Sequence, residues 1–298
     1  MRATSPATFW IGPSGWQYDD WNGVFYPAAP PRGFQSLAYL ARYFNAVEIN
    51  SSFYRMPTAR AAEGWVRRVG PDFRFAIKLT QHFTHQRAAF PSAGDVDAFK
   101  EALRPLREAG RLGPILIQFP WSFRYGPQAT EWLARLADAF AEYARSIEVR
   151  HASWATPEAQ AALAAAGGAC SIDQPRLRDC LPPTMQVTGG RAYVRLHGRN
   201  ARTWFAEGLP PFERYNYLYG EEELKEWVQR LRAMASEAHE VFVFANNHYK
   251  GQGPVNALEL KAMLGGEPVS VPPELLAAYP RLKSIARPSA PQSLFDAE

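Results

Sequence analysis

Cysteine is scarce in this sequence, and the long apolar runs of membrane proteins are missing. The two cysteines, Cys170 and Cys180, form neither a disulfide framework nor a zinc-binding spacing. Cys170 falls in an apolar stretch, which favours a buried, inert thiol. No apolar run approaches the roughly 20 residues that a membrane span needs, and the first residues lack the apolar core of a signal peptide. We therefore expect a cytoplasmic protein with no membrane partner.

Basic residues are scattered, and the longest run is a pair such as Arg67-Arg68. The net charge of +4 and the pI of about 9.1 are mildly basic, whereas a nucleic-acid binder usually also shows a clustered basic stripe. Nucleic acid is therefore an alternative partner that is not favoured. No G-x-G-x-x-G follows the first predicted strand, which argues against a dinucleotide-binding fold. The absence of G-x-S-x-G argues against a Ser-His-Asp hydrolase.

Short apolar runs alternate with amphipathic stretches along the chain. The runs are strand-length and rich in β-branched or aromatic residues. They cover residues 9–12, 46–50, 73–78, 114–119, 146–150, 169–173, 192–197 and 240–245. Helical patterns cover residues 35–43, 59–69, 95–108, 127–143, 157–166, 221–238 and 254–264, whereas 174–191 is weakly helical at best. Pro127 and Pro157 suit the first turn of a helix, where no amide donor is needed.

Eight strands alternating with helices predict an α/β fold, a TIM-type (β/α)8 barrel, in a single domain. We expect an N-terminal tail over residues 1–8, the barrel over 9–265, and a C-terminal extension over 266–298 that packs on the barrel. A doubly wound open sheet is the alternative. In a barrel the active site lies at the carboxyl ends of the strands.

Polar residues gather at those strand ends. Pairs spaced two apart share one face of a strand. The pairs are Glu48 with Asn50, Glu148 with Arg150, and Arg195 with His197. Apolar helices seal the outer face, where an unpaired charge is costly, so we expect these pairs to point inward. Single polar residues end four further strands and can join them: Lys78, Gln118, Asp173 and Asn246. Mutual pairing in a structural network is the competing interpretation.

Histidines and aromatic residues concentrate at the same end. Five of the six histidines fall at or just after predicted strand ends: His82, His85, His151, His197 and His248. Histidine exchanges protons near neutral pH. Aromatic residues also follow the strands, among them Trp16, Tyr18, Tyr54, Trp121, Trp154 and Trp204. Together they predict an aromatic-walled pocket for a ring or a sugar face.

Two loops suit an anion. Arg195 and Arg199 surround the end of the seventh predicted strand, and Asn246 and Asn247 end the eighth. Barrels of this type often hold phosphate in these loops. A divalent metal held by Glu48, Glu148, Asp173 and His197 is a weaker alternative, because nearby cations compete for the carboxylates. No cofactor follows with certainty from the sequence.

At these residues the sequence resembles the YecE-like proteins, also called domain of unknown function 72. The motifs span most of the chain. They are Ile11–Tyr18, Trp21 with Phe25–Pro27, Val47–Tyr54, Phe75–Lys78 with Thr84-His85, Leu112–Pro114 with Gln118–Pro120, Glu148–Trp154, Asp173, Tyr193–Arg199 and Phe244–Asn247. Pro13 and His248 depart from the usual family pattern. The resemblance implies a TIM barrel and carries no defined activity.

We therefore expect an enzyme that acts by proton transfer, an isomerase or a hydrolase, on a small anionic substrate such as a phosphorylated compound. The predicted catalytic residues are Glu48, Lys78, Glu148, Asp173 and His197. The predicted binding residues are Trp16, Tyr18, Asn50, Tyr54, His85, Gln118, Arg150, His151, Trp154, Arg195, Arg199, Asn246 and Asn247. A metal-assisted phosphoesterase is the enzymatic alternative. A non-catalytic module that binds nucleic acid or another ligand is the second.

Overall fold

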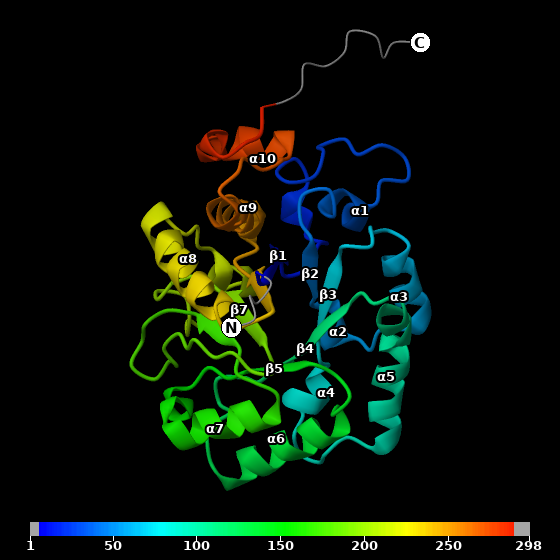
Figure 1. Cartoon of the computed structure of the whole chain (residues 1–298), viewed down its shortest axis with the longest axis vertical. Coiled ribbons are helices and arrows are strands. Elements are labelled where there is room, and N and C mark those ends of the chain that lie inside the picture. The colour runs from blue at the N-terminus through cyan, green and yellow to red at the C-terminus, as the bar shows by residue number, and fades with distance from the viewer. Residues whose placement is uncertain (1–5, 289–298) are drawn as a thin grey trace.

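Parallel strands form the centre of the protein (Figure 1). The computed structural model describes residues 6–288. Within that range eight strands form two four-stranded parallel sheets, in the orders β1-β8-β7-β6 and β2-β3-β4-β5. The strands are β1 (Thr8–Pro13), β2 (Ala46–Ile49), β3 (Arg74–Lys78), β4 (Leu112–Gln118), β5 (Arg145–Glu148), β6 (Ser171–Asp173), β7 (Arg191–Leu196) and β8 (Glu240–Ala245). The predicted α/β class and the strand–helix alternation are confirmed.

Helices surround the strands on the outside (Figure 1). They are α1 (Ser36–Leu40), α2 (Ser51–Tyr54), α3 (Ala59–Val66), α4 (Gln81–Thr84), α5 (Ala93–Glu108), α6 (Pro127–Ala139), α7 (Pro157–Ala166), α8 (Glu221–Ala235), α9 (Gln252–Gly265) and α10 (Pro273–Ala278). Short 3-10 helices are η1 (Asp19–Trp21), η2 (Ala152–Ala155), η3 (Pro211–Tyr215), η4 (Tyr249–Gly251) and η5 (Pro280–Ser284). None of the helices between residues 6 and 288 is long and apolar enough to cross a bilayer.

Helix starts follow local sequence chemistry. The Ser92 hydroxyl accepts a hydrogen bond from the Asp95 amide, and the Asp95 carboxylate accepts one from the Ser92 amide. This reciprocal cap satisfies two amides that would otherwise lack partners in the first turn of α5. Pro127 and Pro157 occupy the first turns of α6 and α7 as predicted. No helix forms between β6 and β7, also as predicted.

The two sheets face each other across a small inner core. Alternate strand residues supply it, because successive side chains point to opposite faces. Its members come from both sheets: Trp10, Ala46, Ala76, Leu116, Cys170, Ile172, Tyr193, Phe242 and Phe244. A larger outer core fills the space between strands and helices, and residues such as Val47, Ile77 and Leu231 belong to it. The inner face is therefore the one that carries polar residues toward the strand ends.

The two sheets meet at two seams. An isolated parallel bridge joins Ser14 to Glu48 between β1 and β2, and another joins Ile147 to Ala169 between β5 and β6. The regular hydrogen-bonded pairing of strands stops at both seams, so the strands form two separate four-stranded sheets. At the first seam Gly12 lies so close to β2 that an added Cβ would collide with the carbonyl oxygen of Ala46. Glycine is required there because the two backbones approach closely.

Near the C-terminus, α10 and η5 follow α9, and Val269 pairs with Ala286 in an isolated bridge. The predicted tail over residues 1–8 and extension over 266–298 are described only in part. Residues 1–5 and 289–298 lie outside the described range. The proposed division at residue 265 stays a prediction.

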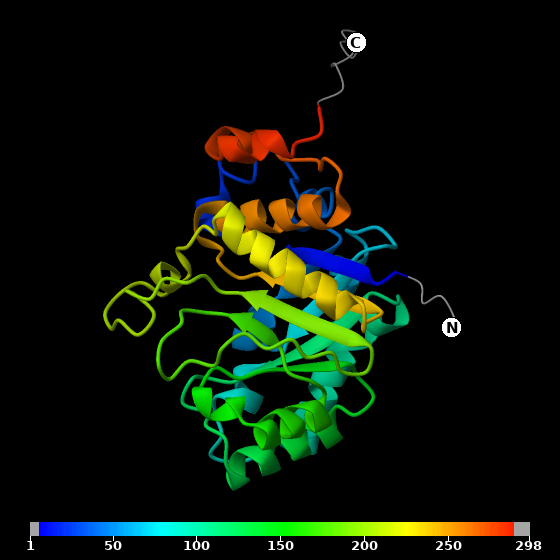
Figure 2. The same ribbon diagram turned by 60° about the vertical axis from the view of Figure 1, so that its left-hand side comes forward.

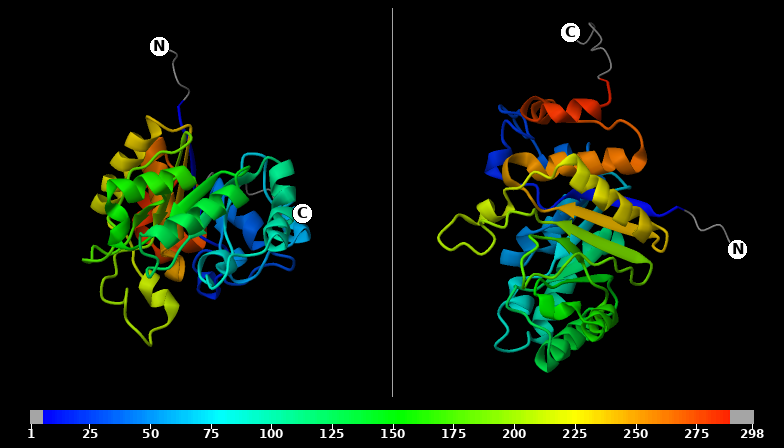
Figure 3. Two further views of the ribbon diagram at one scale, coloured as in Figure 1. Left: turned by 90° about the horizontal axis from the view of Figure 1, so that it is seen from below. Right: turned by 90° about the vertical axis from the view of Figure 1, so that its left-hand side faces the viewer.

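A long segment connects β7 to α8. It spans residues 197–220 and projects beyond the body of the molecule on the side where the strands end (Figures 2 and 3). Phe205, Leu209 and Phe212 are exposed on it. The segment also returns toward the strand ends, where Trp204 and Tyr215 line a cavity. It is therefore placed to form one wall of a site.

Candidate functional site

Arg195 is the centre of a buried polar layer between the two sheets. It lies on β7, with its side chain on the same face as the inner-core residue Tyr193. Its guanidinium donates to both oxygens of Glu48, with Nε 2.9 Å from Oε2 and Nη2 2.6 Å from Oε1. Nη1 donates to Oε2 of Glu148 over 2.6 Å. One arginine thus joins carboxylates from two strands of the opposite sheet.

Glu48 is fully engaged. Besides the two bonds from Arg195, its Oε1 accepts from the Ser14 hydroxyl at 2.8 Å and its Oε2 accepts from the Tyr193 hydroxyl at 2.7 Å. The side chain has no exposed surface. A carboxylate that accepts four hydrogen bonds and has no access to solvent is held firmly in one position, because charge-assisted hydrogen bonds are strong and directional. Glu48 therefore serves to position Arg195.

Glu148 is engaged in a similar way. Arg150 Nε donates to its Oε1 over 2.8 Å, and Arg195 holds its other oxygen. Burial alone would raise the pKa of Glu148, but the positive charges of Arg195 and Arg150 outweigh burial and hold it well below the usual value. Glu148 stays ionised and anchors the two arginines.

His197 completes the layer as a neutral ring. Asn246 donates from Nδ2 to Nδ1 of His197 over 2.9 Å, since the Asn246 oxygen accepts from Arg195 at 3.3 Å. This arrangement assigns the ring proton to Nε2, which lies 3.1 Å from Glu148 Oε1. Burial lowers the pKa of His197 to about 3. His197 therefore stays neutral at physiological pH, and its role here is to accept the hydrogen bond from Asn246.

Above this layer lies a cavity of about 330 Å³ at the carboxyl ends of the strands. Phe, Tyr and Trp make up half of its lining residues, and three cationic side chains face it. The lining residues are Phe53, Tyr54, Lys78, His85, Gln118, Pro120, Trp121, Arg150, Trp204, Phe205, Arg214 and Tyr215. None of these described lining residues is acidic. Positive charge with no facing carboxylate favours an anionic ligand.

Lys78 ends β3 in this cavity. Its Nζ lies 3.8 Å from the centroid of the Phe53 ring, a cation–π distance. The carboxylates that act on it, Glu48 and Glu148, are bonded to arginines. Burial, reinforced by the charge of Arg195, lowers the pKa of Lys78 to about 7. Near neutral pH this amine can therefore accept or release a proton.

Two arginines offer donors beside Lys78. Arg150 uses Nε for Glu148, and its guanidinium carbon lies 5.7 Å from the centre of the Trp204 ring. The Nε of Arg214 is buried and has no hydrogen-bond partner among residues 6–288. A buried donor without a partner costs free energy unless a ligand or water satisfies it. Burial and the charge of Lys78 lower the pKa of the neighbouring His85 to about 4, so this ring is neutral.

A second, smaller cavity of about 240 Å³ lies beside the first, and Tyr54 lines both. Trp16, Tyr18 and Asn50 line it together with Tyr54, which is 77% exposed. The Asn50 oxygen is buried and lacks a hydrogen-bond partner among the described residues. The predicted aromatic binding residues Trp16, Tyr18 and Tyr54 are therefore brought together, next to the cationic cavity.

Asp173 does not join the inner layer. Ile172 of β6 and Cys170 just before the strand belong to the inner core, so Asp173 points to the outer face. There it accepts hydrogen bonds from Arg199 at 2.8 Å and from the Trp227 indole at 3.0 Å. Arg199 also bonds Glu223 of α8 at 3.0 Å. These two predicted site residues hold α8 and the segment after β7 against the strands.

Three more of the predicted binding residues form hydrogen bonds within the fold. Asn247 is buried and donates to the Tyr217 carbonyl at 2.8 Å and to Asn256 at 2.9 Å. Trp154 has no exposed surface and donates to the Phe123 carbonyl at 2.8 Å. His151 accepts from the Ser153 amide at 3.0 Å and caps η2. Gln118, in contrast, lines the cationic cavity.

No metal site forms from the predicted ligands. Among residues 6–288 no group of three or more His, Cys, Asp or Glu side chains is placed to hold an ion. Glu48 and Glu148 are bonded to Arg195, and Asp173 lies on the opposite face of its strand. The metal ligands proposed from the sequence are therefore divided between the inner and the outer faces of the strands.

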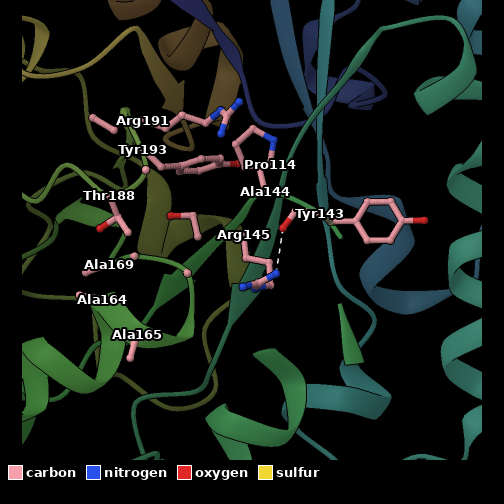
Figure 4. Close-up of a pocket in the computed structure, with 15 residues that line it drawn as sticks. Pro114, Tyr143, Ala144, Arg145, Ala164, Ala165, Ala169, Thr188, Arg191 and Tyr193 are labelled. Carbon is pink, nitrogen blue, oxygen red and sulfur yellow. Dashed lines mark hydrogen bonds between the residues drawn. The ribbon is translucent and has the colours of Figure 1, made fainter. Parts of the chain in front are cut away.

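A further cavity, of about 270 Å³, lies at the amino ends of β5 and β7 (Figure 4). Arg145 donates there to the carbonyl oxygens of Tyr143 at 2.9 Å and Ala166 at 3.0 Å. The Arg145 guanidinium thus donates hydrogen bonds to backbone carbonyl oxygens near this end of the molecule. The cavity has no acid–base pair, and its contacts stabilise the end of the molecule opposite the cationic cavity.

Sequence reasoning missed part of the cationic cavity. Arg214 and Tyr215 belong to the later part of the segment between β7 and α8, far along the chain from any strand end. The rule that strand ends supply the site cannot find them. Phe53, Trp121 and Trp204 had a signal, because each belongs to the aromatic residues that follow the strands.

The sequence places the chain in a family. Residues 10–280 match the family described as protein of unknown function DUF72. The chain belongs to the DUF72 family. The resemblance to YecE-like proteins is thereby confirmed.

Known DUF72 proteins support this assignment. The chain is 28% identical to the UPF0759 protein YunF of Bacillus subtilis over 284 residues, covering 91% of this chain and 99% of YunF. It is 31% identical to the UPF0759 protein YecE of Escherichia coli over 143 residues, or 48% of each protein. A DUF72 family protein of Thermotoga maritima has a similar structure, with a TM-score of 0.76 and 35% identity over 86% of this chain and 99% of that one. A DUF72 family protein of Enterococcus faecalis shares the fold, with a TM-score of 0.76 and 24% identity over 87% of this chain and 96% of that one.

Proposed function

We propose that the protein is an enzyme that acts by proton transfer on a small anionic substrate, with the reaction of an isomerase or a hydrolase. The observation that carries this proposal is the cavity of about 330 Å³ in which Lys78, Arg150 and Arg214 face aromatic walls and no acidic side chain. Its volume is in the range of small-molecule sites. The arginines bind the anion, and Lys78 transfers the proton.

The proposal assigns supporting roles to the buried acids. Glu148 holds Arg150 and Arg195 in place, and Glu48 holds Arg195. Preorganised charges act strongly in a site that excludes water, because they need not reorient during the reaction. An anion bound between Arg150 and Arg214 lies next to the Lys78 amine. The substrate's reacting atom is then close to a group whose pKa of about 7 suits exchange at neutral pH.

We further propose that the eight strands form a closed (β/α)8 barrel. The isolated bridges Ser14–Glu48 and Ile147–Ala169 support closure, since each lies at one of the two seams. The inner core, drawn from both sheets, supports it as well. In such a barrel the cationic cavity occupies the carboxyl-end face, where active sites of this fold lie.

Thermal unfolding in the presence of small anions tests the function. Phosphate, sulfate and small phosphorylated or carboxylated compounds should raise the melting temperature above that in sodium chloride of equal ionic strength, because a ligand of the folded state stabilises it. Arg214→Met, which removes no ion pair, should lose most of this gain, whereas the exposed Arg67→Met should keep it. An Arg214→Met response equal to the parent's would contradict the anion site.

Turnover then separates an enzyme from a binding module. A compound that stabilises the protein is incubated with the parent and with Lys78→Met, and the products are identified by mass spectrometry. Conversion by the parent that is lost in Lys78→Met supports the proposal. Tight binding with no conversion in either protein would assign the cavity to a non-catalytic ligand-binding module.

A further inference from the structure

Lys78 differs from the other lysines of the chain. The sequence has six lysines: Lys78, Lys100, Lys225, Lys250, Lys261 and Lys283. Lys100 and Lys225 form ion pairs with glutamates, at 2.8 Å from Glu142 and 2.8 Å from Glu222. Lys261 donates to a backbone carbonyl, and Lys250 and Lys283 are exposed. Only Lys78 among them lines a cavity described at the strand ends.

The position of the Lys78 amine is fixed by its strand. The Ser52 hydroxyl donates to the Lys78 carbonyl oxygen over 2.6 Å, which ties the end of β3 to α2. The side chain extends across the Phe53 ring of the same helix into the cavity. Arg150 lines the cavity beside it. The neutral, nucleophilic form of an amine is favoured where the amine is buried and lies near another cation.

We propose that Lys78 is a nucleophile that forms an imine with the carbonyl carbon of a small anionic aldehyde or ketone. This inference rests on the proposed function and names its substrate class. Arg150 and Arg214 bind the carboxylate or phosphate of the substrate and so bring its carbonyl group to the Lys78 Nζ.

The chemistry balances without a cofactor. The lone pair of Nζ forms a bond to the carbonyl carbon, and the C=O π electrons move to oxygen, which takes up a proton. Nζ loses its protons as the hydroxyl group leaves with a further proton as water. The products are one imine and one water molecule. Once protonated, the imine withdraws electrons from the neighbouring carbon, so a proton can leave that carbon and return elsewhere. Isomerisation therefore fits this site better than hydrolysis.

Reductive trapping with glyoxylate tests the proposal. Glyoxylate is the smallest aldehyde that carries a carboxylate, and cyanoborohydride delivers a hydride to its imine carbon. The trapped product is a carboxymethyl group on the lysine nitrogen, which peptide mapping assigns to one of the six lysines. At pH 7.5 we expect Lys78 to carry at least about tenfold more label than any other lysine, since among the six it alone lines the cavity with Arg150 and Arg214.

Three variants serve as controls. Lys78→Arg keeps the charge and removes the nucleophile, so labelling of the cavity should be lost. Arg214→Met should reduce labelling of Lys78 without affecting exposed lysines. Lys283→Arg, at an exposed position, should leave labelling of Lys78 unchanged. Melting curves of each variant establish that it is folded before labelling.

The outcomes separate this inference from the proposed function. Label confined to Lys78 and reduced by competing phosphate supports both. If label spreads evenly over exposed lysines while glyoxylate still raises the melting temperature, the imine proposal is overturned and the anion site stands. If glyoxylate neither labels Lys78 nor stabilises the fold, both proposals fail.

Discussion

Arg195 and Glu48 face each other from opposite sheets through two hydrogen bonds, of 2.9 and 2.6 Å, with no exposed surface on the carboxylate. Removing one member of such a buried pair strongly destabilises the fold, because the remaining charge has no partner. In this protein two carboxylates depend on the same guanidinium, since Arg195 also holds Glu148. The pair therefore links the stability of the fold to the position of the site.

Removing Arg195 should be costly. Arg195→Met leaves Glu48 and Glu148 buried without their shared cation, and we expect a loss of about 3–5 kcal/mol in the free energy of unfolding. Arg191→Met on the same strand is the matched control, because its pair with Glu240 is partly exposed and should contribute less than about 1 kcal/mol. Urea unfolding of both variants measures the difference, and equal losses would show that the inner pair is not buried.

The alternation of strand residues made much of this layer predictable. Glu48, Lys78, Gln118, Arg195, His197 and Asn246 all lie two residues after, or in phase with, apolar inner-core positions. Asp173 was misplaced because β6 is short and alternates Ser171 with Ile172, a pattern in which either face could be the inner one. Arg214 was missed because a long segment carries it back to the strand ends, and only tertiary packing decides where that segment lies.

An added methyl group at the seam between β1 and β2 should destabilise the fold. Gly12→Ala places a Cβ against the carbonyl oxygen of Ala46 and must push β1 and β2 apart. We expect a loss of about 1–3 kcal/mol, as for overpacked cores. Gly70→Ala is the control, because nothing lies near an added Cβ there. Thermal unfolding compares the two, and a Gly12→Ala variant as stable as Gly70→Ala would mean that the strands are not in close contact.

Stability should depend on pH through Lys78. Its pKa falls from 10.5, the ordinary value of a lysine amine, to about 7 in the fold, so between these values the unfolded chain binds more protons than the folded one. The stability contributed by this group is therefore greatest above pH 10.5 and declines as the pH falls to 7. The groups around it are Glu48, Glu148, Arg150, Arg195 and His85.

Lys78→Met removes this dependence. Its stability relative to the parent should rise by about 1 kcal/mol for each unit that the pH is lowered from 9 to 7. Chemical denaturation at several pH values measures the change, and Lys283→Met serves as an exposed control that should show no such trend. A constant difference between Lys78→Met and the parent over this range would show that the amine keeps an ordinary pKa.

The segment between β7 and α8 should become more ordered when the cavity is filled. It supplies Trp204, Phe205, Arg214 and Tyr215 to the cavity wall. Hydrogen exchange of residues 200–216 should therefore slow when phosphate binds, while exchange in α5 on the outer surface stays constant. Arg214→Met should show the smaller slowing. Equal protection with and without phosphate would indicate that the segment does not contact the ligand.

The central claim is that the cavity at the strand ends binds a small anion through Lys78, Arg150 and Arg214. The most direct measurement is an anomalous difference map from crystals grown with selenate, a heavy analogue of sulfate and phosphate. We predict a peak within hydrogen-bonding distance of Arg150 and Arg214 and next to the Lys78 amine, between the Trp204 and Phe53 rings. Selenate bound only to arginines on the outer surface, with the cavity free of anomalous density, would contradict it.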